Sequence, residues 1–556
     1  MASQTLNDKY QLWLDHAGQL HDELLSLTEE EIEDAFYRDL AFGTGGLRGV
    51  IGAGTNRMNI YTVAKASQGL ADYVKRRYPG GSIAVSYDSR NFSELFAQVA
   101  SGVFAANGIR VYLYPQLMPT PCLSFATRYY QCSAGIMITA SHNPAKYNGY
   151  KVYNADGCQI TTEAAAEILS EIEKLDIFAD VSQMAFSAAQ ESGLIQWISD
   201  DCYTAFTEAV KQRSVLYGDP IDRNVTIVYS PLNGTGLKPV TRALQESGFT
   251  DIRIVKEQEL PDGNFPTCPY PNPEIKEAMA LGIEYAKRYQ ADLLLATDPD
   301  CDRVGVAVKD GSDYMLLTGN EMGLLLLDYI CSQRRTHDKM PDCPLLVKTI
   351  VTTDMASQIA AHYGVETVNV LTGFKFIGEQ IGFLEKKGED GRYIFGFEES
   401  YGYLSGSHVR DKDAVNAALL ICEMFAYYKT RGICLTDQLR HLYATYGYCL
   451  NTLHSYEFEG SAGMTKMAQI MAQLRSGIPA LGNKTVESVL DYAKGLDGLP
   501  PADVLKFFLS GHCSVTVRPS GTEPKLKVYL SIVADGKDEA LQIEQAAIRD
   551  LEKFLV

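Results

Sequence analysis

The chain has 556 residues, enough for about four domains, and its 46% hydrophobic and 21% charged residues are typical of a globular protein. The formal net charge of −19 argues against a nucleic-acid partner, because affinity for nucleic acid comes largely from Lys and Arg side chains that neutralise phosphates. No apolar stretch of the sequence is long enough to span a bilayer, so we expect a cytoplasmic protein with no membrane partner. None of the 12 cysteines forms a C-x-x-C pair, so we expect neither structural zinc nor a dithiol redox site.

The first 40 residues are predicted to be largely helical. Thr28 and Glu31 have the spacing of a capping box, in which each side chain accepts a hydrogen bond from the other's backbone amide. From residue 82 the pattern changes to alternating strands and helices, and strands are predicted at 83–89, 109–115 and 134–141. Alternation in units of about 30 residues implies β-α-β crossovers and a mostly parallel sheet.

The alternation of strands and helices returns twice along the chain. Its further predicted strands lie at 225–231, 251–258, 291–297, 344–353, 365–371 and 392–397. The last hundred residues differ, because two strands there flank a turn and an amphipathic helix closes the chain. We therefore expect an α/β protein with three similar domains on mixed or parallel sheets, followed by a smaller C-terminal α+β domain.

The segment TASHNPAKYNGYKVY, residues 139–153, follows a predicted buried strand. Ser141 would lie at the carboxyl end of that strand, where α/β sheets place their ligands. Asn143 and Pro144 then interrupt regular structure, because proline donates no backbone hydrogen bond and restricts the residue before it. A serine in such a turn can be phosphorylated, although the residues alone are equally compatible with an ordinary turn at a strand end.

The segment TDPDCDR, residues 297–303, follows the predicted strand 291–297. Asp298, Asp300 and Asp302 would point to one side if the backbone there is locally extended. Carboxylates crowded together need a cation between them, and a set of oxygen ligands suits Mg²⁺ or Ca²⁺ better than zinc. An EF-hand is excluded by Arg303 and Lys309, which occupy the positions of its glycine and its glutamate. A solvated acidic turn remains open.

Two further loops offer polar side chains. In GFEESYG, residues 396–402, the adjacent Glu398 and Glu399 would point oppositely on an extended segment, so they suit sugar hydroxyls, with Ser400, better than glycosidase chemistry. In RPSGTEPK, residues 518–525, an arginine, two hydroxyls and the backbone amides near a glycine form a candidate anion site: Arg518, Ser520, Gly521 and Thr522. Taken singly, each loop favours an ordinary exposed turn over a binding site.

Together with FGTGGLRG at residues 42–49, these four loops and their order resemble the α-D-phosphohexomutase superfamily, and the phosphoglucomutases most closely. The resemblance spans residues 42–533. It implies four domains around a central cleft, which we place at 1–205 for the phosphoserine, 206–322 for the metal, 323–447 for the sugar and 448–556 for the phosphate.

The resemblance also implies a role for individual residues. Ser141 would carry the phosphoryl group, and Asp298, Asp300 and Asp302 would bind Mg²⁺ with an oxygen of that group. Lys151 is similar to a position implicated as the general base, with Arg48 and His142 as further catalytic residues. The implied substrate-binding residues are Arg303, Gly373, Lys375, Glu398, Ser400, His408, Arg410, Lys412, Arg518, Ser520, Gly521 and Thr522.

The activity implied by the resemblance is the interconversion of glucose 1-phosphate and glucose 6-phosphate, with glucose 1,6-bisphosphate as intermediate and activator. Phosphopentomutase and phosphomannomutase are the alternatives within the family, because relatives share the DPD and EES patterns. A metal-dependent sugar phosphatase is the alternative outside it. The expected partner is a small phosphosugar, and the expected state is a monomer or a weak homo-oligomer.

Overall fold

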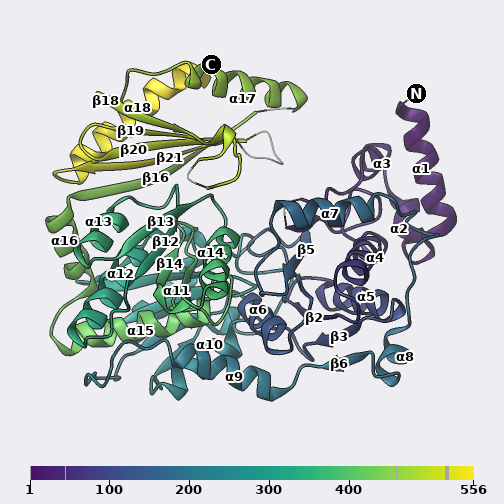
Figure 1. The fold of residues 1–556 in the computed structure, drawn as a ribbon, viewed down its shortest axis with the longest axis horizontal. Helices are drawn as coiled ribbons and strands as arrows, with labels where there is room; N and C mark the ends of the chain where they lie inside the picture. The colour runs from purple at the N-terminus through teal and green to yellow at the C-terminus, as the bar shows by residue number, and fades with distance from the viewer. Residues whose placement is uncertain (1, 44, 459, 497, 520–524, 556) are drawn as a thin grey trace.

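The computed structural model describes residues 2–43, 45–458, 460–496, 498–519 and 525–555. Four sheets organise the chain (Figure 1). In that view the purple and blue N-terminal unit lies on the right, the teal and green second and third units lie on the lower left, and the yellow-green C-terminal sheet lies above the third unit. None of the described helices is both long and apolar enough to cross a membrane.

Short helices precede the first sheet and pack around Trp13, which is 1% exposed. They are α1 (Ala2–His16), α2 (His21–Ser26) and α3 (Glu29–Phe36). The capping box predicted at the start of α3 is confirmed: Glu31 N donates to Thr28 Oγ1 at 3.3 Å and Thr28 N donates to Glu31 Oε2 at 2.9 Å.

The first sheet has the strand order β1-β5-β4-β2-β3-β6. Its strands are β1 (Gly46–Val50), β2 (Ser82–Tyr87), β3 (Arg110–Leu113), β4 (Ala134–Ile138), β5 (Tyr147–Asn154) and β6 (Ile195–Trp197). β2 pairs in parallel with β3 and β4, whereas β5 and β1 add an antiparallel edge. Its larger helices are α4 (Ile60–Arg77), α5 (Ser93–Ala106), α6 (Thr120–Tyr129) and α7 (Thr162–Ile172). Every residue of β4 is buried, as expected for a strand covered on both faces.

The second and third sheets repeat the arrangement of parallel strands with an antiparallel edge, in the orders β11-β10-β9-β7-β8 and β13-β12-β14-β15. Their strands are β7 (Ile227–Ser230), β8 (Ile252–Ile254), β9 (Leu293–Thr297), β10 (Val304–Asp310), β11 (Asp313–Leu317), β12 (Leu345–Thr349), β13 (Glu366–Val370), β14 (Tyr393–Phe397) and β15 (Tyr403–Leu404). Their main helices are α10 (Leu237–Glu246), α11 (Lys276–Tyr289), α12 (Gly319–Thr336), α13 (Met355–His362), α14 (Phe374–Lys386) and α15 (Ala414–Thr430). One hydrophobic core runs through both units, because α15 packs against α10.

The C-terminal unit is an antiparallel sheet in the order β16-β21-β20-β19-β18-β17, packed against two helices. Its elements are β16 (Tyr448–Glu457), α17 (Gly460–Arg475), β17 (Ala480–Leu481), β18 (Lys484–Asp491), β19 (Leu505–Leu509), β20 (Cys513–Pro519), β21 (Lys525–Ala534) and α18 (Lys537–Leu555). The predicted fold class, three α/β units and a smaller α+β unit, is confirmed.

The sheets position the predicted motifs at corresponding places. The serine, aspartate and glutamate loops begin directly after β4, β9 and β14, at the carboxyl ends of these strands. Because the strands are buried and hydrogen-bonded on both sides, the loops leave rigid supports.

Candidate active site

The serine loop leaves β4 and turns sharply at Ser141, whose φ of 53° lies in the left-handed region. Ser141 N donates to Thr139 Oγ1 at 2.7 Å, and this bond closes the turn. The Ser141 hydroxyl is buried, donates to Asp298 Oδ2 at 2.8 Å and lies 3.2 Å from His142 Nδ1. Burial, followed by the charge of Arg303, lowers the pKa of His142 well below its ordinary value, so this ring is neutral at neutral pH. The predicted serine and aspartate loops therefore meet.

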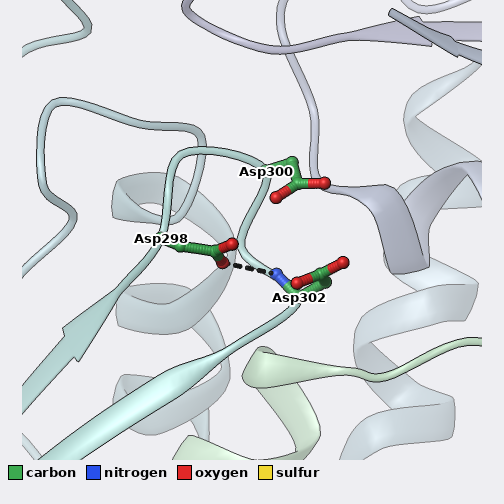
Figure 2. Close-up of side chains that lie close together, drawn as sticks. All are labelled: Asp298, Asp300 and Asp302. Atoms are coloured by element: carbon green, nitrogen blue, oxygen red, sulfur yellow. Dashed lines mark hydrogen bonds between the residues drawn. The ribbon is translucent and has the colours of Figure 1, made fainter. Parts of the chain in front are cut away.

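The aspartate loop connects β9 to β10 through a tight turn. The backbone here is not the extended segment on which the sequence argument was conditional: Cys301 N donates to Asp298 O at 2.9 Å, and Cys301 has a φ of 50°. The turn nevertheless brings the three carboxylates together, with ligand oxygens of Asp298, Asp300 and Asp302 all within 4.8 Å of one another. Figure 2 shows the three side chains converging, with Asp298 Oδ1 accepting from Asp302 N at 3.1 Å. Cys301 itself is fully buried, as a packed side chain.

The donor set of this aspartate cluster fits a hard divalent cation. Asp300 Oδ1 and Asp302 Oδ1 are buried and have no hydrogen-bond partner among the described residues. Burial, followed by the charges of Asp302 and Asp300, raises the pKa of Asp298 well above its ordinary value. Burial alone would also raise the pKa of Asp300, but Lys151 outweighs it and the pKa is lowered. Buried carboxylate oxygens that accept no hydrogen bond form a ligand set that suits Mg²⁺.

Two lysines neutralise part of this acidic cluster. Lys151 Nζ, on β5, donates to Asp300 Oδ2 at 2.8 Å and lies 3.6 Å from Asp302 Oδ2. Lys412 Nζ lies 3.0 Å from Asp302 Oδ2. Burial works to lower the pKa of both lysines, but the aspartates outweigh it and both values are raised. In the metal-free site, both lysines are therefore protonated at neutral pH.

A cavity of about 920 Å³ is lined by residues of all four units, among them His142 and Arg303, the chain neighbours of Ser141 and Asp302. Ser141, Lys151 and the three aspartates are not themselves among its described lining residues. The cavity includes most of the predicted catalytic and substrate-binding side chains: Arg48, His142, Arg303, Gly373, Lys375, Glu398, Ser400, Lys412 and Arg518. Gly373 N donates to Glu398 Oε1 at 3.1 Å, which joins two of the predicted segments. The predicted Ser520, Gly521 and Thr522 lie outside the described residues.

The two adjacent glutamates point to different partners, as expected for an extended segment. Glu398 contacts Gly373, whereas Glu399 Oε2 lies 3.4 Å from the hydroxyls of Thr349 and Thr352. Burial, followed by the charge of Glu398, raises the pKa of Glu399 to about 7. The carboxylate of Glu398 is thus held by the backbone of Gly373. The carboxylate of Glu399 changes its charge near neutral pH.

His408 and Arg410 are not among the described residues that line the cavity. His408 Nε2 lies 2.9 Å from Asp413 Oδ2, and the fully buried Arg410 donates to Glu385 Oε2 at 2.7 Å. Arg410 N also donates to Ser124 Oγ at 2.9 Å, so this segment joins the third unit to the first. These contacts support the walls of the site, and their expected part in substrate binding stays a prediction.

Sequence reasoning missed other residues of the site. Thr120 Oγ1, at the start of α6, donates to Asp300 Oδ2 at 2.9 Å, and Glu274 Oε1 accepts from Arg303 Nη1 at the cavity wall. Asp88 and Arg90 follow β2 at the same sheet edge as Ser141. The segment YDSR, polar residues directly after a buried strand, is the signal that could have identified these two.

The chain matches known proteins along most of its length. It matches phosphoglucomutase/phosphomannomutase alpha/beta/alpha domain I over residues 39–177, domain II over 204–311 and domain III over 318–446. It is 35% identical to a phosphoglucomutase of Staphylococcus saprophyticus over 546 residues, 96% of this chain and 98% of the relative. It is also 35% identical to a phosphoglucomutase of Staphylococcus aureus over 553 residues, covering 97% and 98%.

Solved structures with the same fold are more distant in sequence. The open form of parafusin, a phosphoglucomutase from Paramecium, aligns with a TM-score of 0.70 at 18% identity, covering 93% of this chain and 95% of that one. A phosphoglucomutase/phosphomannomutase family protein from Burkholderia thailandensis aligns with a TM-score of 0.69 at 18% identity, covering 92% and 97%. At these identities the likeness shows the fold.

Proposed function

The chain belongs to the phosphoglucomutase/phosphomannomutase family, and on that premise we propose that it interconverts glucose 1-phosphate and glucose 6-phosphate through a phosphorylated Ser141. The observation that carries the proposal is the Ser141 hydroxyl, 2.8 Å from Asp298 Oδ2 beside a cavity of about 920 Å³. Cationic side chains from separate units, Arg48, Lys375 and Arg518, line that cavity and suit a substrate with phosphates at both ends.

The reaction takes place in two transfers. In the first, the bond between phosphorus and Ser141 Oγ breaks, a bond from phosphorus to a sugar hydroxyl oxygen forms, and Lys151 takes the hydroxyl proton. The resulting bisphosphorylated sugar turns over, and its other phosphate returns to Ser141 Oγ. Arg518 binds the phosphate that is not reacting, in both orientations. Glu398 accepts hydrogen bonds from ring hydroxyls.

Asp298, Asp300 and Asp302 would hold a Mg²⁺ ion in this site, together with an oxygen of the Ser141 phosphate. Bound there, the ion would neutralise charge on the transferring phosphoryl group and compete with Lys151 for the carboxylates, which favours the neutral amine that a base requires. Glucose 1,6-bisphosphate would be the intermediate and the activator, since it can rephosphorylate Ser141.

We also propose that the enzyme works in the cytoplasm as a monomer or a weak homo-oligomer. A charged phosphosugar does not cross an apolar bilayer unaided, so the enzyme belongs where its substrate is made.

The test is a coupled assay of purified protein with glucose 1-phosphate, mannose 1-phosphate and ribose 1-phosphate, in the presence of Mg²⁺ and glucose 1,6-bisphosphate. We expect preferred turnover of glucose 1-phosphate, a phosphate on Ser141 in the intact mass, and loss of turnover by chelation. Ser141→Ala should lose nearly all activity, by roughly 10³-fold or more, because the reaction has no other phosphoryl acceptor. Ser192→Ala, at an exposed serine of the same unit, is the matched control.

The outcomes separate the alternatives. Preference for ribose or mannose 1-phosphate would assign the chain to the pentose or mannose enzymes of the family. Release of inorganic phosphate without isomerisation would make it a phosphatase. Full activity of Ser141→Ala would contradict the phosphoserine mechanism.

A further inference from the structure

Arg90 binds the serine loop through the backbone of that loop. It lies just after β2, its side chain is fully buried, and it donates to four backbone carbonyl oxygens of the segment 141–147. Its Nη1 donates to Pro144 O and Tyr147 O, each at 3.0 Å, and its Nη2 donates to Ser141 O at 2.5 Å and to Asn143 O. A planar guanidinium with fixed donor directions thereby defines the path of the whole loop.

The guanidinium is itself held in place. Asp88 Oδ2 lies 3.4 Å from Arg90 Nε, and Asp88 Oδ1 accepts from Arg90 N at 2.9 Å and from Ser93 Oγ at 2.7 Å. The ring of Phe265, from the second unit, covers the guanidinium carbon at 5.2 Å from its centroid. A buried charge persists only when it is paired and hydrogen-bonded, and here the bonds it makes are those to the serine loop.

The loop needs such support because Ser141 is strained. A non-glycine residue at a φ of 53° costs about 1–2 kcal/mol relative to ordinary backbone, and it relaxes unless its surroundings hold it. Arg90 binds the carbonyl of this same residue. Rotation of Ser141 back to negative φ would turn that carbonyl away from Arg90 and the hydroxyl away from Asp298.

We propose that Arg90, oriented by Asp88, is a positioning residue that holds Ser141 in its left-handed conformation and so aims the Ser141 oxygen at the aspartate cluster and the cavity. The inference rests on the proposed function for the chemistry at Ser141, and its geometry is independent of which sugar reacts. Neither Arg90 nor Asp88 is among the described residues that line the cavity, so the pair acts on the transfer step and not on substrate affinity.

A merely structural role for Arg90 would lower the stability of the first unit and affect activity only as far as folded protein is lost. A positioning role would lower the activity of the folded protein independently of its stability. A misplacement of about 1 Å at a reacting group lowers the rate by about 100-fold without any loss of folded protein. The kinetic constants of the folded variant therefore distinguish the two roles.

The experiment compares Arg90→Lys and Arg90→Gln with wild type, and uses Arg57→Lys as the matched control. Arg57 also binds backbone carbonyl oxygens and an aspartate, Asp34, but does not contact the serine loop in any described bond. We measure kcat and KM for glucose 1-phosphate, the melting temperature, and amide hydrogen exchange by mass spectrometry without substrate. Peptides covering 139–149 and 227–230 report the loop and a distant strand.

We expect kcat to fall about 100-fold in Arg90→Gln and less in Arg90→Lys, which keeps the charge and part of the donors, with KM within about twofold of wild type. Exchange should accelerate in 139–149 and stay unchanged in 227–230. Arg57→Lys should keep wild-type kcat. If the Arg90 variants do not fold, Asp88→Asn replaces them, because it keeps the size of the side chain and removes only the charge that orients the guanidinium; it should lower kcat in the same direction.

The proposal is overturned if kcat of the folded variants equals wild type, if KM rises while kcat is unchanged, or if exchange accelerates equally in both peptides. Failure of the proposed function would look different. Wild-type protein would then not isomerise the sugar phosphates, while faster exchange confined to 139–149 would still support the positioning role and unchanged exchange there would still contradict it.

Discussion

Glu398 and Glu399, adjacent residues of the glutamate loop, differ in charge behaviour because their partners differ. Glu398 faces Lys412 and Arg303, whereas Glu399 contacts the hydroxyls of two threonines of the third unit. Burial and the charge of Glu398 then raise the pKa of Glu399 to about 7, with Glu274 adding to the shift and Arg303 opposing it. The folded protein therefore binds a proton on Glu399 that the unfolded chain releases near its ordinary pKa of 4.5.

This shift predicts a pH-dependent stability. Between about pH 4.5 and 7 the folded state binds more protons than the unfolded state, so the contribution of Glu399 is most favourable below this window and is lost as the pH rises through it. Glu399→Gln removes the ionisable group. The free energy of unfolding of the variant, relative to wild type, should therefore be higher at pH 8 than at pH 5 by on the order of 1–2 kcal/mol. Melting temperatures of both proteins across pH 5–8 measure this. A constant difference would contradict the assigned shift.

At the scale of elements, a buried ionic cluster joins the third sheet to the C-terminal sheet. Lys348 on β12 and Lys506 on β19 both reach Asp354, which precedes α13, at 3.1 and 2.9 Å. Ser514 Oγ on β20 donates to the other carboxylate oxygen of Asp354 at 2.9 Å. Because β20 includes Arg518, this cluster links the strand that carries Arg518 to Thr352, whose hydroxyl contacts Glu399.

Removing Asp354 should destabilise this joint. Lys348 and Lys506 are 0% and 4% exposed, so Asp354→Ala leaves two buried charges uncompensated and should lower the free energy of unfolding by about 3 kcal/mol. Adding Lys506→Met should recover part of that loss, because one buried charge is removed. Thermal melting of the single and double variants measures both. Asp503→Ala, at the exposed ion pair with Arg475, is the control and should change stability by less than about 1 kcal/mol. A double variant less stable than the single one would contradict the account.

At the scale of the whole molecule, the cavity is divided among units. Glu398 belongs to the third unit, Arg518 to the fourth, and Arg303 to the second, so under the proposed function the sugar and the far phosphate would contact different units. Each loop contributes little alone, and the site exists only when the units pack around one space.

Variants of the two substrate-binding loops should therefore fail in different ways. Arg518→Ala should remove a charged contact to every phosphosugar, which would cost roughly 2–5 kcal/mol of binding free energy. The value of kcat/KM should therefore fall by a similar factor for glucose, mannose and ribose 1-phosphates. Glu398→Ala removes hydrogen bonds whose geometry differs between sugars, so discrimination among the three substrates should shrink. The measurement is kcat/KM for the three substrates in wild type and both variants. Equal losses for all three substrates in Glu398→Ala would show that this loop does not select the sugar.

Local chemistry in the sequence was enough for the elements and for most motifs. Buried apolar runs predicted β2, β4, β9 and β14, and polar residues directly after three of them marked Ser141, the aspartates and Glu398 as candidates, whose roles came from the resemblance of the loops taken together. The capping box at Thr28 was equally local. Such patterns can be recognised in a sequence because buried apolar residues recur with the repeat of a helix or strand, and because turns require particular residue types. The domain boundaries at 205, 322 and 447 stay predictions.

Contacts between distant parts of the chain could be read only from the packed structure. Arg90 meets the loop of Ser141 and Thr120 meets Asp300 because neighbouring strands and units bring these residues together across 51 and 180 positions of sequence. The aspartate loop is a turn and not an extended segment, because Cys301 adopts a left-handed backbone with a φ of 50°, and its buried sulfur lies close to Gly236. His408 and Arg410 were predicted to bind substrate, yet they contact Asp413 and Glu385, and none of the four is among the described residues that line the cavity. No local pattern encodes which side chain a third element will meet, because that depends on how the sheets pack against one another.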